Sequence, residues 1–379
     1  MEEKYLEQYV ISLRRDFHRL PELSMKEFET SKRVCRELEE MGIPYRMAGE
    51  TGVIAEIRGA APGPVVVLRG DMDALPIQED TGLEYASRVP GVMHACGHDA
   101  HTAMLLGAAK LLSERKESLS GAVRLAFEPG EEVGAGARPL IAAGVLEGAD
   151  SVFAIHVAQN MPAGTVNVQA GPRMCGCGVL ILTIKGKSGH GSSPDKGIDV
   201  IPAGAAMVSA LQTVVSREFG PQDHVVVSVG TFHAGTAPNI IAGEAKLTGS
   251  LRYMDPALKD RIPAAVERII RGTAAAFRVE VEVKCPMVLP PVVNDSACSA
   301  VAARAAQGLL KVREMPASTG SDDFAMYVER VPGVYAFLGT GGEYSAHHEK
   351  FTLDEGALAS GSRLYARYAL EYMAQYQKN

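Results

Sequence analysis

Several residue types and patterns are scarce in this 379-residue sequence, and most of these scarcities exclude a class of protein. Tryptophan is absent, which by itself excludes nothing. Cysteine is scarce and scattered, and the six occurrences are Cys35, Cys96, Cys175, Cys177, Cys285 and Cys298. Small secreted domains held by disulfides carry denser cysteine patterns, so we expect no disulfide framework and a reducing, cytoplasmic location.

Positive charge is also in deficit, because 38 Lys and Arg face 45 Asp and Glu, giving a net charge of −7. No basic field therefore favours nucleic acid as a partner. No apolar run approaches the roughly 20 residues of a membrane span, so we expect no membrane partner. The opening stretch, MEEKYLEQYVISLRRDFHRL, predicts a charged amphipathic helix rather than a signal peptide. A nucleotide-binding protein is disfavoured because neither GxGxxG after a strand nor GxxxxGK[ST] occurs.

Short apolar runs alternate with helical patterns over much of the chain. The runs VVVLR, AVRLAF and SVFAIHV predict buried strands, with helices at about 98–114 and 137–146 between them. This alternation indicates an α/β domain with a mostly parallel sheet. Between 179 and 289 the order becomes βαββαβ, which is typical of a ferredoxin-like α+β unit. We therefore expect a catalytic domain of residues 1–178 and 290–379, interrupted by an inserted domain of residues 179–289.

Acidic or imidazole side chains follow three of these predicted strands: Asp71, Asp73, Glu131, Glu132 and His156. Ligands of open α/β sheets bind at the carboxyl ends of the strands, so these groups should gather at one edge. The stretch HACGHDAH, residues 94–101, opens the next helix at that same edge. The sequence thus predicts a cluster rich in metal-ligating groups.

A divalent cation would resolve the repulsion among clustered carboxylates. Cysteine, histidine and glutamate all serve as ligands of zinc-like metals, and a thiolate combined with carboxylates also allows manganese, cobalt or nickel. Alone, Cys96 would be a buried inert thiol, but with His98 two residues later it is better explained as a ligand. His94 and His101 are more typical of supporting or packing residues.

The remaining candidates also have ordinary structural explanations. His156 could be a satisfied core histidine, and Glu131 with Glu132 a solvated loop pair. The EPG turn before the two glutamates favours a catalytic pair instead, in which one carboxylate binds metal while the other takes a proton from water. Cys175 and Cys177 lack partner histidines or a second cysteine pair, which disfavours a second metal or redox site.

Eight ordered motifs then carry a resemblance that covers nearly the whole chain: RGDMDALPIQE, MHACGHDAHTAMLLGAAKLL, FEPGEEVGAGA, HV, GKSGHGSSP, GTAPNIIAGEAKLTGSLR, GSDDFA and HHEKF. They resemble the amidohydrolase branch of the di-metal aminoacylase/carboxypeptidase family, which includes hippurate, indole-acetyl-amino-acid and N-acetyldiaminopimelate hydrolases. The resemblance implies metal-dependent hydrolysis of N-acetyl or N-aroyl L-amino acids. Alternatives are a dipeptidase or carboxypeptidase on the same site, or a non-catalytic metal-binding protein, which an unliganded Glu131 disfavours.

The resemblance also implies a role for particular residues. It implies two divalent ions per subunit (manganese, zinc, cobalt or nickel) held by five ligands: Cys96, His98, Glu132, His156 and His347. Glu131 matches the general base and Asp73 the aspartate that orients a ligand. Asp71 stands where related peptidases carry a liganding histidine. The inserted domain would act as a lid and assemble the chains into a homodimer or homotetramer.

Three lid residues are implied as well. His190 matches a histidine that reaches a neighbouring subunit's site, and Arg252 matches the arginine that holds the substrate carboxylate. Asn239 is expected beside Arg252. Departures from the family pattern are Glu128 for the usual glutamine, Glu349 for the usual proline, and the small residues of RMCGCG. Asp322 with Asp323, in GSDDF, would either cap a helix or support the site.

Overall fold

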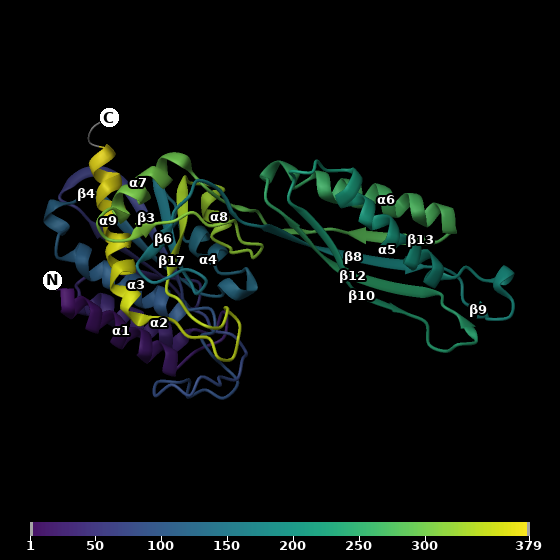
Figure 1. Ribbon diagram of the computed structural model, residues 1–379, viewed down its shortest axis with the longest axis horizontal. Helices are drawn as coiled ribbons and strands as arrows, with labels where there is room; N and C mark the ends of the chain where they lie inside the picture. The colour runs from purple at the N-terminus through teal and green to yellow at the C-terminus, as the bar shows by residue number, and fades with distance from the viewer. Residues whose placement is uncertain (1–2, 377–379) are drawn as a thin grey trace. The chain divides into compact units, whose positions relative to one another are not determined.

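The computed structural model describes residues 3–376 and divides into two compact units (Figure 1). The first unit comprises Met1–Arg173, Val293–Pro316 and Asp322–Asn379, and the second comprises Met174–Val292 and Ala317–Ser321. The second unit is longer at both ends than the expected 179–289, and it includes a short segment that was not expected there. The apolar pattern locates strands, but it does not reveal where the chain changes its packing partners.

The first unit is built on an eight-stranded sheet of order β1-β2-β4-β3-β5-β17-β6-β16. Strand β3 pairs in parallel with β4 and β5, and β17 pairs in parallel with β5, so the predicted mostly parallel sheet is confirmed. The strands are β1 (Tyr45–Ala48), β2 (Gly52–Arg58), β3 (Ala61–Asp71), β4 (Ser120–Glu128), β5 (Ser151–Ala158), β6 (Thr165–Asn167), β16 (Lys311–Val312) and β17 (Gly333–Gly339).

The helices of this unit are α1 (Glu3–Arg19), α2 (Phe28–Glu40), α3 (His98–Ser113), α4 (Ala137–Ala142), α7 (Ser296–Ala306), α8 (Ala325–Val328) and α9 (Leu358–Tyr376). Helices α3 and α9 pack against each other and against β3 and β5. Their close approach needs glycine, because a Cβ on Gly107 would overlap Ser362 and one on Gly361 would overlap Met104. Helix α4 is shorter than predicted, since Gly144 at φ +80° ends the helical run.

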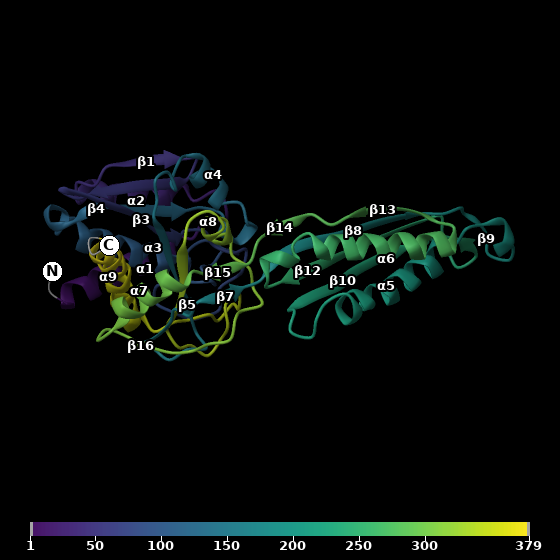
Figure 2. The same cartoon turned by 90° about the horizontal axis from the view of Figure 1, so that it is seen from above.

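The second unit has the predicted order βαββαβ, formed by β8 (Gly176–Lys185), α5 (Val200–Arg217), β10 (Val225–Ala234), β12 (Glu244–Tyr253), α6 (Arg261–Phe277) and β13 (Glu280–Lys284). Its sheet has the order β10-β12-β8-β13, with short β14 (Met287–Leu289) also on β8. Helices α5 and α6 lie along the same face of the sheet (Figure 2). The ferredoxin-like expectation is confirmed. Two further pairs of short strands form sheets of their own. In the second unit, β9 (Gly189–His190) pairs with β11 (Ile240–Ile241), and at two points where the chain passes from one unit to the other, β7 (Gly171–Met174) pairs with β15 (Val292–Asn294).

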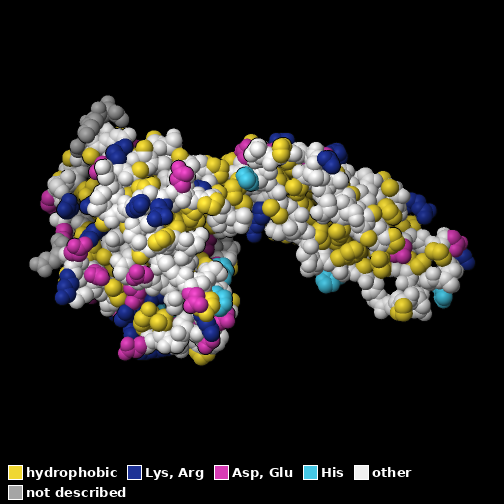
Figure 3. All heavy atoms as spheres, in the orientation of Figure 1, with side chains coloured by type: hydrophobic (Ala, Val, Ile, Leu, Met, Phe, Trp, Pro, Cys, Tyr) yellow, Lys and Arg dark blue, Asp and Glu magenta, His cyan; other side chains and the backbone are white. Residues whose placement is uncertain are grey.

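Helix α5 and strand β10 of the second unit are rich in apolar residues. Helix α5 is, within residues 3–376, the one helix whose length and composition would allow a membrane span, although core helices pass the same test. Its buried side chains pack in the core beneath β8 and β12. Strand β10 is at the edge of the sheet and exposes Val226 and Phe232. Figure 3 shows hydrophobic side chains gathered over the strands of this unit.

Candidate active site

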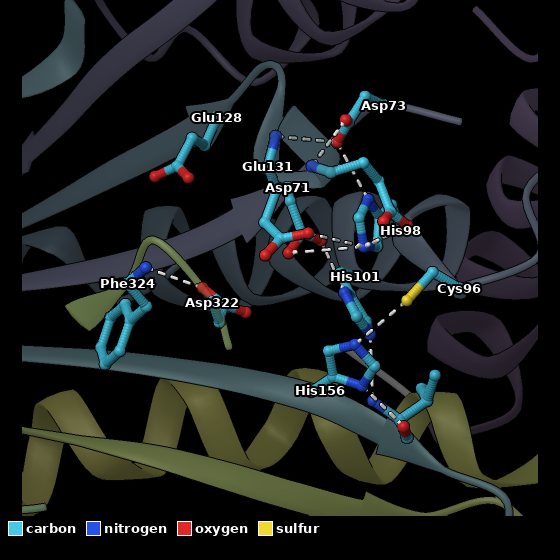
Figure 4. Close-up of polar contacts among 12 residues, drawn as sticks. Asp71, Asp73, Cys96, His98, His101, Glu128, Glu131, His156, Asp322 and Phe324 are labelled. Atoms are coloured by element: carbon cyan, nitrogen blue, oxygen red, sulfur yellow. Dashed lines mark hydrogen bonds and ion pairs between the residues drawn. The ribbon is translucent and has the colours of Figure 1, made fainter. Parts of the chain in front are cut away.

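The parallel strands β4, β3 and β5 lie side by side and end at one edge of the large sheet. Asp71 ends β3, Glu128 ends β4, and His156 lies near the end of β5. Helix α3 begins at His98 at this edge (Figure 4). The polar groups that the sequence placed at strand ends are therefore brought together by the sheet itself.

The carboxylate of Asp73 connects most parts of the cluster. It lies 3.0 Å from Nδ1 of His98, and it accepts the backbone N–H groups of Glu131 and Glu132 at 3.2 and 3.0 Å. Ser24 donates its hydroxyl to the same carboxylate at 2.7 Å. Burial alone would raise the pKa of Asp73, but the hydrogen bond from His98 lowers it below the usual range. One ionised side chain thus fixes both a histidine and the glutamate pair.

Two histidines are held in the tautomer that suits a metal ligand. His98 donates its Nδ1–H to Asp73, and its Nε2 is buried without a hydrogen-bond partner within the described chain. His156 donates its Nδ1–H to the carbonyl oxygen of Val157 at 2.7 Å, and its Nε2 lies 3.5 Å from Sγ of Cys96. Burial lowers the pKa of His156 to about 3, so the ring is neutral at pH 7 and its lone pair is available.

Five candidate ligands form two groups of donor atoms that share one member. Cys96, His98 and His156 make one group, and Cys96, Glu132 and His347 make the other, with the atoms of each group within 4.8 Å of one another. Oε1 of Glu132 is buried without a hydrogen-bond partner in residues 3–376, and its Oε2 lies 3.4 Å from Nε2 of His347. Two buried atoms without a hydrogen-bond partner, Nε2 of His98 and Oε1 of Glu132, thus converge with the other donor atoms in a way that fits two adjacent divalent cations.

The Cys96 thiol lies where the two groups meet. Burial raises its pKa above the usual range, so without a cation the thiol is protonated at neutral pH. A bound divalent metal inverts this balance, because a coordinating thiol loses its proton. The position and the burial of this sulfur therefore suit a ligand shared by two ions.

Glu131 is held differently from its neighbour Glu132. Burial and the nearby carboxylate of Asp322 raise the pKa of Glu131 well above its usual range. Its carboxylate oxygen lies within 4.8 Å of those of Asp322 and Asp323. A carboxylate whose pKa is raised towards neutral pH can take up a proton and release it again, which is the requirement for a general base and acid.

Arg69 is the buried cation that compensates the carboxylates around Glu131, and it was not predicted from the sequence. Its guanidinium donates to Asp71, to Glu128 at 2.8 Å, to Asp322 at 3.2 Å and to Asp323 at 3.1 Å. A single arginine inside the apolar run VVVLR was the available signal, since a fully buried charge needs partners. Glu128, the departure from the family's glutamine, is therefore part of this network.

Asp71 forms a further group of possible metal ligands with His98 and His101, but its own oxygens already have protein partners. It pairs with Arg69 and accepts a hydrogen bond from Nδ1 of His101 at 2.6 Å. Nε2 of His101 accepts the backbone N–H of Val157 at 2.9 Å, so the proton on this ring must be at Nδ1. His101 therefore bridges β3 to the end of β5, where His156 lies, which is a supporting role.

The other two side chains of HACGHDAH, His94 and Asp99, lie apart from the groups of possible metal ligands. Asp99 pairs with Arg14 at 2.8 Å and with Nδ1 of His18 at 2.8 Å, and these contacts hold the start of α3 against α1. His94 is buried, and burial lowers its pKa to about 4. Neither residue belongs to a group of converging donors in the described chain.

The backbone around His347 separates it from its neighbour His348. His347 is in the left-handed region at φ +68°, and its N–H donates to the carbonyl oxygen of Ala95 at 2.8 Å. This backbone bond holds it beside the Cys96 segment. His348 stacks on Tyr344 with ring centroids 4.5 Å apart and accepts a backbone N–H at its Nδ1. Strain of this kind is typical of functional positions.

The three lid candidates fall into two places within the second unit, and one expectation is wrong. Arg252 pairs with Cys177 near one end of β12, where its guanidinium donates to Ser321 at 2.5 Å. His190 and Asn239 lie together beyond the other end, since β9 pairs with β11 and the carbonyl oxygen of Asn239 accepts the N–H of Gly191 (Figures 1 and 2).

Asn239 therefore does not lie beside Arg252. Strand β12 has ten residues and a strand rises about 3.3 Å per residue, so its two ends lie about 25–30 Å apart. Proximity in the sequence motif suggested a common pocket, but an extended strand between the two residues carries them to opposite ends of the sheet.

Comparison with known proteins settles the family. A model of the peptidase family M20/M25/M40 matches residues 67–371. The chain belongs to this family. The N-acetylcysteine deacetylase of Bacillus subtilis is 42% identical over 376 residues, which cover 98% of each chain. Thermostable carboxypeptidase 1 of Saccharolobus solfataricus is 38% identical over 377 residues, which cover 97% of this chain and 96% of the relative.

A solved structure supports the same family assignment. A dinuclear metal-binding peptidase of the M20 family from Bacillus subtilis has a TM-score of 0.89 and 40% identity, covering 98% of this chain and 99% of the other. The family resemblance read from the motifs is confirmed, and the protein is a metal-dependent amidohydrolase. Within this M20-family chain, all six cysteines are unpaired, including Cys175 and Cys177.

We expect Arg69→Met to destabilise the protein by about 3–5 kcal/mol, because it leaves several buried carboxylates without their counter-charge. Urea unfolding at pH 7 measures this change. The matched control is Arg58→Met, an exposed arginine of the same unit, which should change the unfolding free energy by less than about 0.5 kcal/mol. Equal effects of the two substitutions would contradict the role given to Arg69.

Asp323→Asn tests the shared proton of the acidic network. Burial, and then the adjacent Glu128, raise the pKa of Asp323 well above its usual range, so the folded state binds a proton that the unfolded chain releases. The stability from this group is fully present below about pH 4 and is lost as the pH rises through the raised pKa. Asparagine mimics the protonated form.

The stability of Asp323→Asn relative to the unsubstituted protein should therefore increase between pH 5 and pH 8. Urea unfolding of the metal-free proteins across that range measures the difference. Asp80→Asn, at an exposed carboxylate, should give a difference that does not change with pH. If the stability difference between Asp323→Asn and the unsubstituted protein did not change from pH 5 to pH 8, Asp323 would be ionised over the whole range.

Proposed function

We propose that the protein hydrolyses the amide bond of N-acyl L-amino acids, with N-acetyl or N-aroyl groups, to a carboxylic acid and a free amino acid. The observation that carries the proposal is Glu131, a partly buried carboxylate that lies beside His98 and Glu132 on one side and beside Asp322 and Asp323 on the other, and that belongs to neither of the two groups that share Cys96. A site that only bound metal would have no use for such a group. The N-acetylcysteine deacetylase relative has the same kind of activity by name.

In this proposal two divalent ions would be held by the five ligands already described, Cys96, His98, Glu132, His156 and His347. When bound, the metals would polarise the amide carbonyl and lower the pKa of a water molecule from 15.7 towards about 7. The mixed sulfur, nitrogen and oxygen ligands are compatible with manganese, zinc, cobalt or nickel. Asp73 would keep His98 in its liganding tautomer and hold the backbone of the glutamate pair in place.

Glu131 is proposed to move the proton. It would take a proton from the attacking water and return it to the nitrogen of the leaving amine, so that the carboxylate ends the cycle as it began. Its raised pKa favours the return of the proton to the amine after it has been taken from water. Asp322 and Asp323 on its other side would maintain that pKa.

The second unit is proposed to supply the remaining groups. Arg252 would bind the α-carboxylate of the amino acid bidentately, which lysine does less well. His190 would stabilise the developing oxyanion, since its Nδ1 accepts the N–H of Ser192 at 3.2 Å and its Nε2–H therefore points outward as a donor. Asn239, which lies beside His190, would assist there.

We further propose that each site is shared between two subunits of a homodimer or homotetramer. Arg252 and His190 lie at opposite ends of β12, about 25–30 Å apart, whereas an N-acyl amino acid is far shorter. One chain therefore cannot offer both to the same substrate. The exposed apolar residues of the edge strand β10 favour pairing of second units, because such an edge is a ready template for another chain.

A peptidase is the second candidate. The carboxypeptidase relative is 38% identical, and its chemistry differs only in what is attached to the acyl side of the amide. A panel of N-acyl amino acids and dipeptides that share one C-terminal residue separates the two candidates. A cytoplasmic location is proposed on the six unpaired cysteines, which are compatible with a reducing compartment.

Glu131→Gln should retain bound metal but lower kcat on N-acetylmethionine or N-benzoylglycine by about 10²–10⁴-fold, because it removes the proton acceptor without removing a ligand. Metal analysis and initial rates after addition of manganese, zinc, cobalt or nickel measure both properties. Glu84→Gln, at an exposed glutamate, is the control and should change neither. Activity that survives in Glu131→Gln would refute the assignment of the base.

Subunit sharing predicts complementation. Glu131→Gln and His190→Ala should each be nearly inactive alone, whereas a mixture allowed to exchange subunits should recover about a quarter of full activity, since half of the dimers carry one intact site. Rates after mixing equal amounts, with co-purification of differently tagged chains to prove exchange, provide the measurement. No recovery despite exchange would place His190 in its own chain's site.

A further inference from the structure

Met25 adopts a backbone conformation that its residue type disfavours. It is the third residue of a tight turn, residues 23–26, closed by a hydrogen bond from the N–H of Lys26 to the carbonyl oxygen of Leu23 at 3.0 Å. Its φ is +62°, a value for which turns favour glycine or asparagine. In the described chain only two other non-glycine residues, Arg278 and His347, have positive φ.

Those other two positions have explanations. Arg278 ends helix α6, where the left-handed conformation is common, and His347 belongs to the candidate metal site. Met25 ends no helix and offers no metal ligand of the kind found there. Strain of this type persists only where the surroundings impose it, and it is concentrated at functional sites.

The surroundings that impose it are parts of the catalytic machinery. Ser24, within the turn, donates to Asp73 at 2.7 Å. One oxygen of the buried Glu27 carboxylate accepts both the N–H of Met25 at 2.7 Å and the N–H of Gly130 at 2.8 Å. Ser24 thus fixes the turn to Asp73, and Glu27 fixes it to Gly130, the residue before Glu131.

The Met25 side chain is nevertheless not buried. It is 39% exposed, and its thioether rests on Gly130 so closely that a Cβ at that position would overlap it. On the other side of the glutamate pair, Val133 is 60% exposed at the end of the short helix Glu131–Val133. One apolar side chain thus rests on the residue before the proposed base, and another ends the short helix that the base begins. The strained backbone of Met25, rather than its exposure, singles it out.

Because the Met25 thioether rests on Gly130, the residue before Glu131, it lies near the position of a substrate whose amide reaches that carboxylate. The amino-acid half of an N-acyl amino acid carries a carboxylate, whereas the acyl half is uncharged. An apolar, flexible thioether suits the uncharged half. Building on the proposed function, we propose that Met25 is a specificity-determining residue that contacts the acyl group and favours aroyl and longer alkanoyl groups over acetyl.

Met25→Asn and Met25→Gly test this assignment, because both residues adopt positive φ readily and neither supplies an apolar side chain. The measured quantity is kcat/KM for N-benzoyl- and N-octanoylmethionine, each divided by kcat/KM for N-acetylmethionine. Both ratios should fall about 10-fold in both variants, the effect of losing an apolar contact to the substrate. The melting temperature should stay the same or rise, because strain is relieved while metal content is retained.

Met47→Asn is the matched control, since Met47 is 45% exposed on β1, the edge strand of the large sheet, where it lies opposite Val53. It should leave both ratios unchanged. N-acetylalanine, compared with N-acetylmethionine, reports the amino-acid side and should respond alike in all proteins.

Three results would overturn the assignment. Acyl ratios that stay within about twofold of wild type in both variants would remove any role in specificity. A changed preference between N-acetylalanine and N-acetylmethionine would move the contact to the amino-acid half. An equal loss on every substrate with a lower melting temperature would make Met25 a structural residue. Wild-type protein that cleaves none of these substrates would instead refute the proposed function on which the assignment rests.

Discussion

The carboxylate of Asp73 is the contact on which the site depends. It orients His98, holds the backbone of Glu131 and Glu132, and accepts the hydroxyl of Ser24. These partners come from a helix start, a loop after a strand and a turn near the N-terminus, which no local interaction would bring together. Because one buried acceptor serves all of them, a change at any one is transmitted to the others.

The second constraint is the balance of buried charge, and the positive charge of Arg69 supplies it. Its guanidinium faces four carboxylates, two of which approach the proposed base. One positive charge cannot neutralise this many acids, so some of them keep a proton in the folded state. Burial raises the pKa of Glu131, the negative charge of Asp322 raises it further, and the positive charge of Arg69 opposes that rise.

Much of this site could be predicted from sequence because it follows from topology. Apolar runs located the parallel strands, and parallel strands deliver Asp73, Glu131 and His156 to one edge whatever the details of packing. The Arg69 network could not be predicted, since its partner Asp322 is more than 250 residues away. The wrong placement of Asn239 has the same origin, because motif proximity carries no information on the direction and length of the strand that follows.

Cys96 shows what burial does to reactivity before a metal arrives. The same burial that raises the pKa of its thiol keeps it protonated, and protonated thiols react slowly with oxidants. With a cation bound, a sulfur that serves as a ligand would be a thiolate engaged by the metal. In the proposed site, burial before metal binding and ligation after it would therefore both limit oxidation of this sulfur.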